Sequence, residues 1–471
     1  MATKFFAGTR QIAANAAPAL NEIRSQQRHP NPERQQQGFV SWFRNSSPYI
    51  HAHRKRTFVI SFGGEAVLDP AFASHVHDLA LLSSLGVRLV LVHGIRPQID
   101  ERLQKLGIPP RFYRHLRITD DTALQCVKEA AGLVRVEIEA LLSMGLANSP
   151  MAGARIRVVS GNFVTARPIG VIDGIDYCHT GEIRKVDQEA IQQQLERHNV
   201  VLISPTGYSP SGEIFNLCAE QVATDIAIAL QAEKLLLLTE QKLCEPGSGQ
   251  LLQQLTTSQA EQFLEQHQDL AATVIHPLQA AIRSCQGGVQ RAHLLERTQD
   301  GALLLELFTR DGSGTLISST PFETLRQATL DDIPGILELI APLEEQGKLV
   351  KRSREHLEMQ IDDYTIIERD GLIIGCAALH DIRDSDAGII ACFAIHENYQ
   401  NADRGKQLFA SIHSQARQRQ LQKLFVLSTQ TMHWFVERGF QPAGLDDLPV
   451  ALRRQYDHQR NTRILCLPLE P

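Results

Sequence analysis

Apolar and polar residues follow two alternating patterns between residues 55 and 318 of the 471-residue chain. Short apolar runs predict buried strands, and these runs are TFVISF, VRLVLVH, VVLIS and KLLLLT. FASHVHDLALLSS and EQVATDIAIALQAE have the spacing of amphipathic helices, and Gly86 is expected to end the first of them. Strands that alternate with such helices predict a parallel sheet covered by helices, so we expect an α/β domain here.

A second domain is expected over residues 325 to 471. Thr329 stands before Asp331, Asp332 and a run with helical apolar spacing, which is typical of a capped helix start. YTIIERDGLIIGCAALH predicts a hairpin that turns at Asp370-Gly371. Residues 379 to 412 are then typical of a strand, a turn and a helix, and KLFVLS and TMHWFVERGF add another strand and helix.

The first 37 residues differ from the rest of the chain. They are rich in Gln, Ala and Arg, poor in acidic residues, and contain no apolar core of signal-peptide length. We expect a disordered extension, with a transit peptide as the alternative. Helical apolar spacing at Phe39, Trp42 and Phe43 predicts a helix over residues 38 to 54.

Composition narrows the class of protein. The net charge of −6 argues against nonspecific nucleic-acid binding, and no apolar run approaches the roughly 18 residues that span a bilayer. The eight cysteines form no C-x-x-C pair and no Cys/His ligand spacing. We therefore expect reduced thiols in a cytoplasmic protein, with no metal site, no nucleic-acid partner and no membrane anchor.

The turn in the stretch from 379 to 412 raises a question of chemistry. A strand, a turn and a helix N-terminus commonly bind a pyrophosphate. This turn has one glycine and carries a carboxylate where another is expected: Gln400-Asn401-Ala402-Asp403-Arg404-Gly405. With the order of elements around it, the turn resembles the Q/R-x-x-G-x-G/A signature of the GCN5-related N-acetyltransferase superfamily. The aromatic-rich helix and x-G-F that commonly end this superfamily match Trp434, Phe435, Gly439 and Phe440.

This resemblance implies an α+β fold and acetyl-CoA as a co-substrate, with no permanently bound cofactor. Residues of the strand and the turn are then expected to contact acetyl-CoA, namely Cys392, Phe393, Ile395, Gln400, Arg404 and Gly405.

GKLVKRSREHLEMQIDDYTIIERDG, KLFVLSTQTMHWFVERGFQP and LPVALRRQYDHQRNTRIL further resemble the acetyltransferase half of the bacterial N-acetylglutamate synthase family. That family acetylates the α-amine of L-glutamate at the entry to arginine biosynthesis. Guanidinium groups grip carboxylates bidentately, and by resemblance Arg352, Arg460 and Thr462 would hold the glutamate. Ser428 would protonate the leaving thiolate, and Cys392 would act through its backbone amide.

One position departs from this family. A glutamate usually precedes the Cys392 position by three residues and serves as general base, but here the residue is Ile389. Three interpretations remain open at this stage. A histidine (His380, His396 or His433) relays the proton, the amine loses its proton to solvent, or the domain is slow or silent.

The first domain resembles the amino-acid kinase family, especially acetylglutamate kinase, which implies a parallel-sheet sandwich. Three phosphate-handling positions depart from that family. Ser61 replaces a lysine, Gly94-Ile95-Arg96 replaces three glycines, and Thr239-Glu240 replaces T-D-x-x-G. Phosphoryl transfer needs cationic groups and backbone donors around the phosphates, so we expect no kinase activity.

A further resemblance concerns regulation. Arginine-inhibited members of the kinase family carry a histidine, a glutamate thirteen residues later, and G-x-G-T, and this chain has His293, Glu306 and Gly312-Ser313-Gly314-Thr315. This implies an L-arginine site in which Glu306 pairs the guanidinium. The helix at Phe39 to Phe43 resembles one that interlaces subunits in such relatives, implying a homo-oligomer, a hexamer. Two alternatives stay open: a non-catalytic arginine-sensing or partner-binding protein, and an acetyltransferase for another amine.

Overall fold

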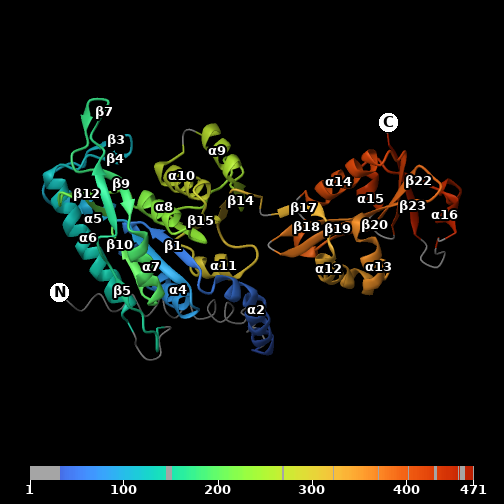
Figure 1. The fold of residues 1–471 in the computed structure, drawn as a ribbon, viewed down its shortest axis with the longest axis horizontal. Coiled ribbons are helices and arrows are strands. Elements are labelled where there is room, and N and C mark those ends of the chain that lie inside the picture. Colours follow the sequence, from blue (N-terminus) through green and yellow to red (C-terminus); the bar gives the residue numbers. More distant parts are fainter. Residues whose placement is uncertain are drawn as a thin grey trace, which may run out of the picture. The chain divides into compact units, whose positions relative to one another are not determined.

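The computed structural model describes residues 32–144, 151–267, 270–321, 323–369, 371–400, 403–428, 432–454, 456 and 462–469. The chain divides into two compact units, which adjoin in sequence at Ser319 and Thr320. Each unit has its own sheets and cores (Figure 1).

The first unit is built on a mostly parallel sheet. Among the described residues it has eight strands, in the spatial order β14 (Gln254–Thr256), β16 (Thr315–Ser318), β15 (Arg291–Glu296), β13 (Lys234–Thr239), β1 (Thr57–Phe62), β2 (Arg88–His93), β10 (Val200–Ile203) and β5 (Val158–Val159). The one antiparallel pairing of this described sheet joins β15 to β16. The apolar runs that predict strands in the sequence are its central strands, and the α/β expectation is confirmed.

Helices cover both faces of this sheet because its central strands are apolar on both sides. Phe58 and Ile60 of β1 pack on one set of helices and Val59 on the other. The first set is α3 (Gly64–Leu68), α4 (Phe72–Ser84), α5 (Arg96–Lys105), α6 (Asp121–Leu142) and α11 (Ala302–Phe308). The second is α7 (Gln188–Glu196), α8 (Ala219–Ala229), α9 (Thr257–Gln266) and α10 (Ala272–Gln286). Gly86, with φ +89°, follows α4 as expected.

Smaller sheets lie beside the main one. The described residues include a sheet of β12 (Ile214–Asn216), β11 (Thr206–Tyr208), β6 (Val164–Pro168) and β9 (Gly181–Val186). They also include two short hairpins, β3 (Phe112–Tyr113) with β4 (Leu116–Arg117) and β7 (Val171–Ile172) with β8 (Ile175–Asp176).

The N-terminal helix, α2, spans Pro32–His53 and so begins earlier than the expected residue 38. Proline suits the first turn of a helix, where its missing N–H costs nothing, and the Gln-rich segment that follows is made of good helix formers. Composition alone predicts disorder up to residue 37, and this prediction is wrong for residues 32–37. The helix continues through Pro48, within the predicted range.

The second unit is built on one mixed sheet. Its described strands follow the order β17 (Glu323–Gln327), β18 (Tyr364–Arg369), β19 (Leu372–Asp381), β20 (Ala387–Ile395), β21 (Lys423–Ser428), β23 (Arg463–Pro468) and β22 (Gln441–Ala443). Neighbouring strands are antiparallel except β20 and β21, which are parallel. The hairpin predicted around Gly371 is the β18–β19 pair.

Two groups of helices cover opposite faces of this sheet (Figure 1). The first comprises α14 (Arg404–Gln418) and α15 (Met432–Val436). The second comprises α12 (Ile333–Glu345), α13 (Arg354–Gln360) and, further along, α16 (Val450–Arg453). Single-turn 3₁₀ segments are η1 (Leu330–Asp332), η2 (Ile361–Asp363), η3 (Glu397–Tyr399) and η4 (Leu445–Asp447).

The predicted helix start at Thr329 is confirmed, because Thr329 and Asp332 form a reciprocal capping box. None of the helices in the described ranges combines the length and apolarity that a bilayer-crossing segment requires.

Candidate functional site

In the second unit, β20 and β21 pair only over their first four residues. The parallel pairing joins Ala387–Ile390 to Lys423–Val426. Yet β20 continues to Ile395 and β21 to Ser428. Because buried backbone N–H and C=O groups require partners, the unpaired part of β20 on this side can accept an extended ligand as a third strand.

Cys392 lies in this unpaired part and has an unusual backbone. Its φ is +52°, a region that residues other than glycine rarely adopt. The register of β19 and β20 shifts here, as in a β-bulge, which re-aims backbone groups. The thiol of Cys376 donates to the carbonyl oxygen of Cys392 at 3.3 Å, and the Cys392 side chain is buried. Any contact of Cys392 with a ligand would therefore use its backbone.

Arg352 lies between α12 and α13 and is half-buried. Its Nη1 donates to the carbonyl oxygen of Val350 at 3.1 Å, and its backbone nitrogen donates to Glu344 Oε1 at 2.9 Å. A hydrogen bond from Cys376 and the positive charge of Arg352 lower the pKa of the Cys392 thiol. The guanidinium therefore acts electrostatically on the unpaired part of β20.

Two other candidates lie at one end of the sheet. Ser428 ends β21, is buried, and stands opposite Arg463 in the pairing of β21 with β23. Thr462 directly precedes that arginine, is half-buried, and its carbonyl oxygen accepts a 2.7 Å hydrogen bond from Tyr456 Oη. Arg460 lies outside the described residues.

The N-terminus of α14 is the candidate anion site. Asp403 occupies the N-cap position but caps no backbone amide, and its carboxylate pairs with Lys406 at 2.7 Å. Among the described residues no side chain caps the first-turn amides of this fifteen-residue helix, so these amides can bind an anion. Gln400 is exposed, and its Nε2 donates to the carbonyl oxygen of Ile395 at 3.3 Å.

Arg404 is placed differently from the expectation of a phosphate-facing side chain. Its Nε and Nη2 donate to the two carboxylate oxygens of Glu323 at 2.9 and 2.6 Å, and Nη1 donates to the carbonyl oxygen of Tyr399. Glu323 also accepts from Arg369 at 2.8 Å. A phosphate would have to compete with this carboxylate, so in this structure Arg404 ties α14 to β17. The sequence reasoning missed Glu323, whose partner lies 81 residues away.

An aromatic cluster lies beside this helix end. Phe393 of β20 contacts Trp434, with ring centroids 5.1 Å apart. A Cβ on Gly405 would lie 3.1 Å from Trp434 Cζ2, so glycine at this position makes room for the indole. Ile395 is half-buried in the same apolar cluster.

The predicted regulatory residues meet at one turn in the first unit. His293 Nδ1 donates to Glu306 Oε1 at 2.6 Å. The other carboxylate oxygen of Glu306 accepts from the backbone nitrogens of Ser313 and Gly314 at 2.6 and 2.9 Å. Gly312 adopts φ +66°, and a Cβ there would lie 2.4 Å from Glu306 Oε2.

The sequence predicts that Glu306 pairs a guanidinium, and in this structure its carboxylate is already engaged by His293 and the turn. The side chain is only 5% exposed, and both of its oxygens are already occupied. Burial alone would raise the pKa of Glu306, but the hydrogen bonds from His293 and the turn amides lower it to about 2. Burial and Lys234 lower the pKa of His293, so a neutral imidazole faces a charged carboxylate. Glu306 shapes the glycine turn.

Helix α2 is attached to the segment next to this turn. Ser46 Oγ donates to the carbonyl oxygen of Phe308 at 3.2 Å, and His53 Nε2 donates to that of Leu307 at 2.7 Å. Burial and the charge of Lys234 lower the pKa of His53 to about 4.

We expect acid to loosen this attachment. The unfolded chain protonates His53 near its ordinary pKa of 6.5, whereas the folded chain resists protonation until about 4. The unfolded state therefore binds more protons in this window, and stability falls as the pH drops from 6.5 to 4. At roughly 1.4 kcal/mol per pKa unit, the effect is on the order of 3–4 kcal/mol. Thermal unfolding across this pH range should show a flatter dependence for His53→Gln.

The control is His51→Gln, which removes an exposed histidine of the same helix and should leave the pH dependence unchanged. An equal pH dependence in wild type and His53→Gln would contradict this assignment.

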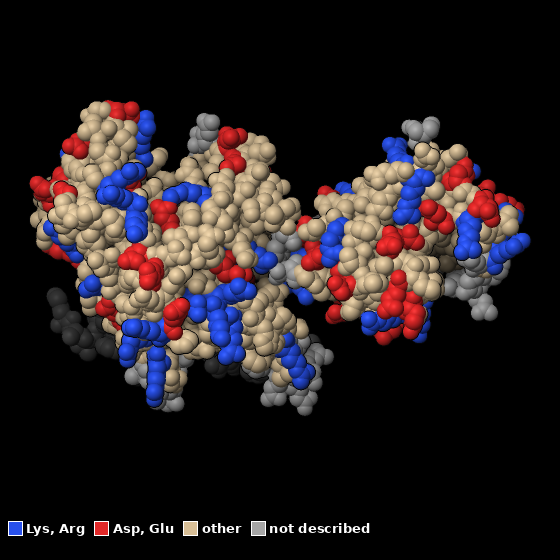
Figure 2. Space-filling view, viewed as in Figure 1, with Lys and Arg blue, Asp and Glu red and all other residues tan. Residues whose placement is uncertain are grey.

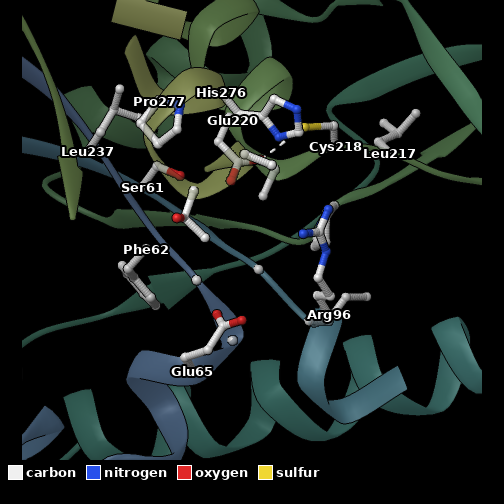
Figure 3. A pocket seen from close by; sticks show the side chains of 18 of the residues that line it. Ser61, Phe62, Glu65, Arg96, Leu217, Cys218, Glu220, Leu237, His276 and Pro277 are labelled. Carbon is white, nitrogen blue, oxygen red and sulfur yellow. Dashed lines mark hydrogen bonds between the residues drawn. The ribbon is translucent and has the colours of Figure 1, made fainter. Parts of the chain in front are cut away.

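The first unit also contains a cavity of about 170 Å³ at the carboxyl ends of β1, β2 and β13 (Figure 3). This cavity is lined by residues of the predicted kinase-like site, including Ser61, Arg96 and Glu240. Figure 3 shows Glu65 and Arg96 at the starts of α3 and α5, with Ser61, Glu220 and His276 around the same space. Glu240 also lines it and accepts from Arg297 at 2.6 Å. A triphosphate would meet several carboxylates here and no lysine among the lining residues.

The glycine loops of this cavity pack against each other. A Cβ on Gly94 would lie 2.9 Å from the backbone nitrogen of Gly64 and 3.0 Å from Gly63 Cα. Gly94 also donates its N–H to the carbonyl oxygen of Phe62 at 2.7 Å, and Gln98 Nε2 donates to that of Gly64 at 2.8 Å. These glycines therefore serve close packing in addition to any ligand.

Charged side chains of both signs are interspersed over the face of each unit shown in Figure 2. Within the described ranges, no group of three or more His, Cys, Asp or Glu side chains is placed to hold a metal ion.

Family models match both units. The amino acid kinase family matches residues 56–296, and the acetyltransferase (GNAT) domain matches residues 360–442. An amino-acid acetyltransferase of Azotobacter vinelandii is 54% identical over 427 residues, which cover 90% of this chain and 98% of that protein.

Two solved structures of N-acetylglutamate synthase from Neisseria gonorrhoeae are also similar. The complex with coenzyme A and L-arginine is 41% identical, with a TM-score of 0.83. The complex with coenzyme A and N-acetyl-glutamate is 42% identical, with a TM-score of 0.59. Each match covers 92% of this chain and 100% of that one.

Proposed function

This chain belongs to the amino-acid acetyltransferase family, and from that premise we propose that it transfers the acetyl group of acetyl-CoA to the α-amine of L-glutamate. The chain is an acyltransferase whose GNAT domain follows an amino-acid kinase fold. The choice of glutamate rests on the N-acetyl-glutamate complex of the similar Neisseria enzyme and on the expected guanidinium cluster. As expected from composition, we propose a cytoplasmic location.

The observation that carries the proposal is the end of the β20–β21 pairing at Ile390. The pantetheine of acetyl-CoA would add to β20 as an extended strand, and the amide of Cys392 would face the thioester oxygen. The amine would attack the thioester carbon directly, so no acyl-enzyme forms. Ser428 would donate a proton to the departing thiolate. Arg352, Arg460 and Thr462 would hold the two carboxylates of glutamate.

The pyrophosphate of acetyl-CoA would lie at the N-terminus of α14. Its open first-turn amides supply the donors, and pairing with Lys406 offsets the charge of Asp403. Gln400 and Gly405 stay in this proposed site, together with Phe393 and Ile395 along the strand. We assign Arg404 a supporting role through Glu323.

We further propose that L-arginine binds at the turn around Gly312 and changes acetyl transfer. Similarity to the L-arginine complex of the Neisseria enzyme supports this regulatory site. The glycine turn offers backbone groups to the ammonium and carboxylate of arginine, while Glu306 and His293 hold its shape.

The proposed homo-oligomer, a hexamer, rests on α2. Its N-terminal half exposes the large apolar side chains of Val40, Trp42 and Phe43, a stripe of the kind that marks a protein interface.

The test is release of free CoA thiol from acetyl-CoA and L-glutamate, with and without L-arginine, between pH 7 and 10. We expect turnover that arginine alters. Turnover that persists with other amines but not with L-glutamate would favour another amine substrate. No thiol release, with arginine still bound in calorimetry, would favour a sensor, for which Ile389 is the specific argument.

A further inference from the structure

The absent general base has a neighbour that the sequence alone did not single out. In the antiparallel pairing of β19 with β20, His380 stands directly opposite Ile389. Directly opposed residues project to the same face, with Cβ atoms roughly 4.5–5.5 Å apart. The imidazole therefore lies beside the position where the family carries its glutamate.

A carboxylate orients this imidazole. His380 Nδ1 donates to Asp363 Oδ2, at the end of η2, at 2.8 Å. Because an ionised carboxylate only accepts hydrogen bonds, the proton resides on Nδ1 and the Nε2 lone pair is left to take another proton. No hydrogen bond to Nε2 is found within the described ranges, and the side chain is 20% exposed, so a solvent-side group can reach it.

The carboxylate is itself fixed in place. Arg419 Nη1, at the end of α14, lies 3.5 Å from Asp363 Oδ1 and donates to the carbonyl oxygen of Leu379 at 3.0 Å. It also donates to Asp381 Oδ1 at 3.1 Å. The Tyr364 ring lies at 6.2 Å from the His380 ring. The ionisable groups known to surround His380 are thus two carboxylates, one guanidinium and one phenol.

His380 lies on the face of the sheet that carries the proposed acceptor site. Leu379 and Ile390, which point the other way, pack against α14 in a cluster separate from that of Tyr364, Cys392 and α12. His380, one residue on from Leu379, projects to the second of these faces. The paired part of β20 ends one residue past Ile389, so the thioester would sit close by.

The other two histidines lie elsewhere. His396 follows β20 and contacts the Tyr399 ring, with centroids 5.5 Å apart, and Tyr399 belongs to the cluster under α14. His433 is on α15, whose neighbouring residues Met432 and Trp434 pack into that same cluster.

We propose that His380, held by Asp363, is the general base that replaces the missing glutamate, an assignment that rests on the proposed function. Nε2 takes one proton from the α-ammonium, directly or through one water. The nitrogen lone pair then attacks the thioester carbon, and the C–S bond breaks with its electron pair going to sulfur. Ser428 gives its proton to the thiolate, and the second nitrogen proton, which is lost as the amide forms, reprotonates Ser428 through water. His380 returns its proton to solvent, so one proton is released per turnover.

The test compares His380→Gln with wild type by thiol release between pH 6 and 9.5. Loss of a positioned base typically costs roughly 10²–10⁴-fold, so we expect such a fall in kcat near pH 7.5. The deficit should shrink at high pH, where solvent deprotonates the amine. Asp363→Asn should lower kcat less and alter the acidic limb of the pH profile. His413→Gln on α14 is the matched control and should behave as wild type.

A gain-of-function variant distinguishes a catalytic role of His380 from a merely structural one. Ile389→Glu in the His380→Gln background returns a carboxylate to the family position and should recover at least about tenfold in kcat. Wild-type kcat and pH profile in His380→Gln would overturn the base while leaving the proposed function intact. A deficit equal at all pH values, with no recovery by Ile389→Glu, would show a structural role and also overturn it. A wild type silent with L-glutamate would overturn the proposed function itself.

Discussion

Replacing Arg352 with glutamine should lower kcat/KM for L-glutamate by at least about a hundredfold, since a charge-assisted bidentate contact is lost. Among the described residues its guanidinium makes one hydrogen bond, from Nη1 to the carbonyl of Val350, which leaves donors for a substrate carboxylate. The loss should appear mainly in the KM for glutamate, and the KM for acetyl-CoA should change little. Steady-state thiol release with each substrate varied in turn provides the measurement.

Arg354→Gln is the matched control. Arg354 lies two residues further on, is mostly exposed, and pairs with Glu358 at 2.8 Å within α13. Exposed pairs of this kind contribute roughly 0–1 kcal/mol, so kcat/KM should stay within a few-fold of wild type. Equal losses in the two variants would mean that general charge attraction, rather than a specific grip at Arg352, draws glutamate to the site.

Glu306→Gln should destabilise the first unit by roughly 2–4 kcal/mol and abolish any response to L-arginine. The Glu306 carboxylate accepts hydrogen bonds from His293 and from two turn amides. The side-chain NH₂ group of glutamine would place its own hydrogens against some of these donors. Acetyl transfer without arginine should persist, since the transferase residues belong to the other unit. Thermal unfolding and thiol release with increasing arginine measure the two effects.

The pH dependence of stability provides a second test of Glu306. The folded pKa of Glu306, about 2, is below its ordinary 4.5, so its stabilising contribution is present above pH 4.5 and is lost as the pH falls toward 2. Glu306→Gln should lack this acid-sensitive part. The control is Glu296→Gln on β15, whose pairing with Lys242 is loose at 3.8 Å. If Glu306→Gln kept both wild-type stability and the arginine response, the turn would not depend on this carboxylate.

Most of the fold could be predicted because strands and helix starts depend on residues that are close together in the sequence. The central strands of the first unit are nearly uninterrupted apolar runs, and the Thr329 capping box spans four residues. The missed features depend on distant partners. The sequence predicts that Arg404 contacts a phosphate, but its guanidinium binds Glu323. It predicts that Glu306 pairs a guanidinium, but its carboxylate accepts hydrogen bonds from the turn amides.

The His380–Ile389 pairing shows why the site was harder to predict than the fold. It depends on strand register across a loop, which pairs residues of two strands. Counting residues back from the loop could have suggested the pair, but not the contact with Asp363. The signal available in the sequence was a histidine on the strand before the missing base.

The interlocked glycines of the first unit bear on how such chains are classified. A side chain at Gly94 would collide with the backbone at Gly64, whatever the cavity binds. The fold therefore requires these glycines whether or not the cavity binds a phosphate. In a genome survey, a glycine motif of this kind would therefore not by itself distinguish a kinase from a protein that shares only the kinase fold. The residue two positions before the glycine pair, here Ser61, would be the better guide.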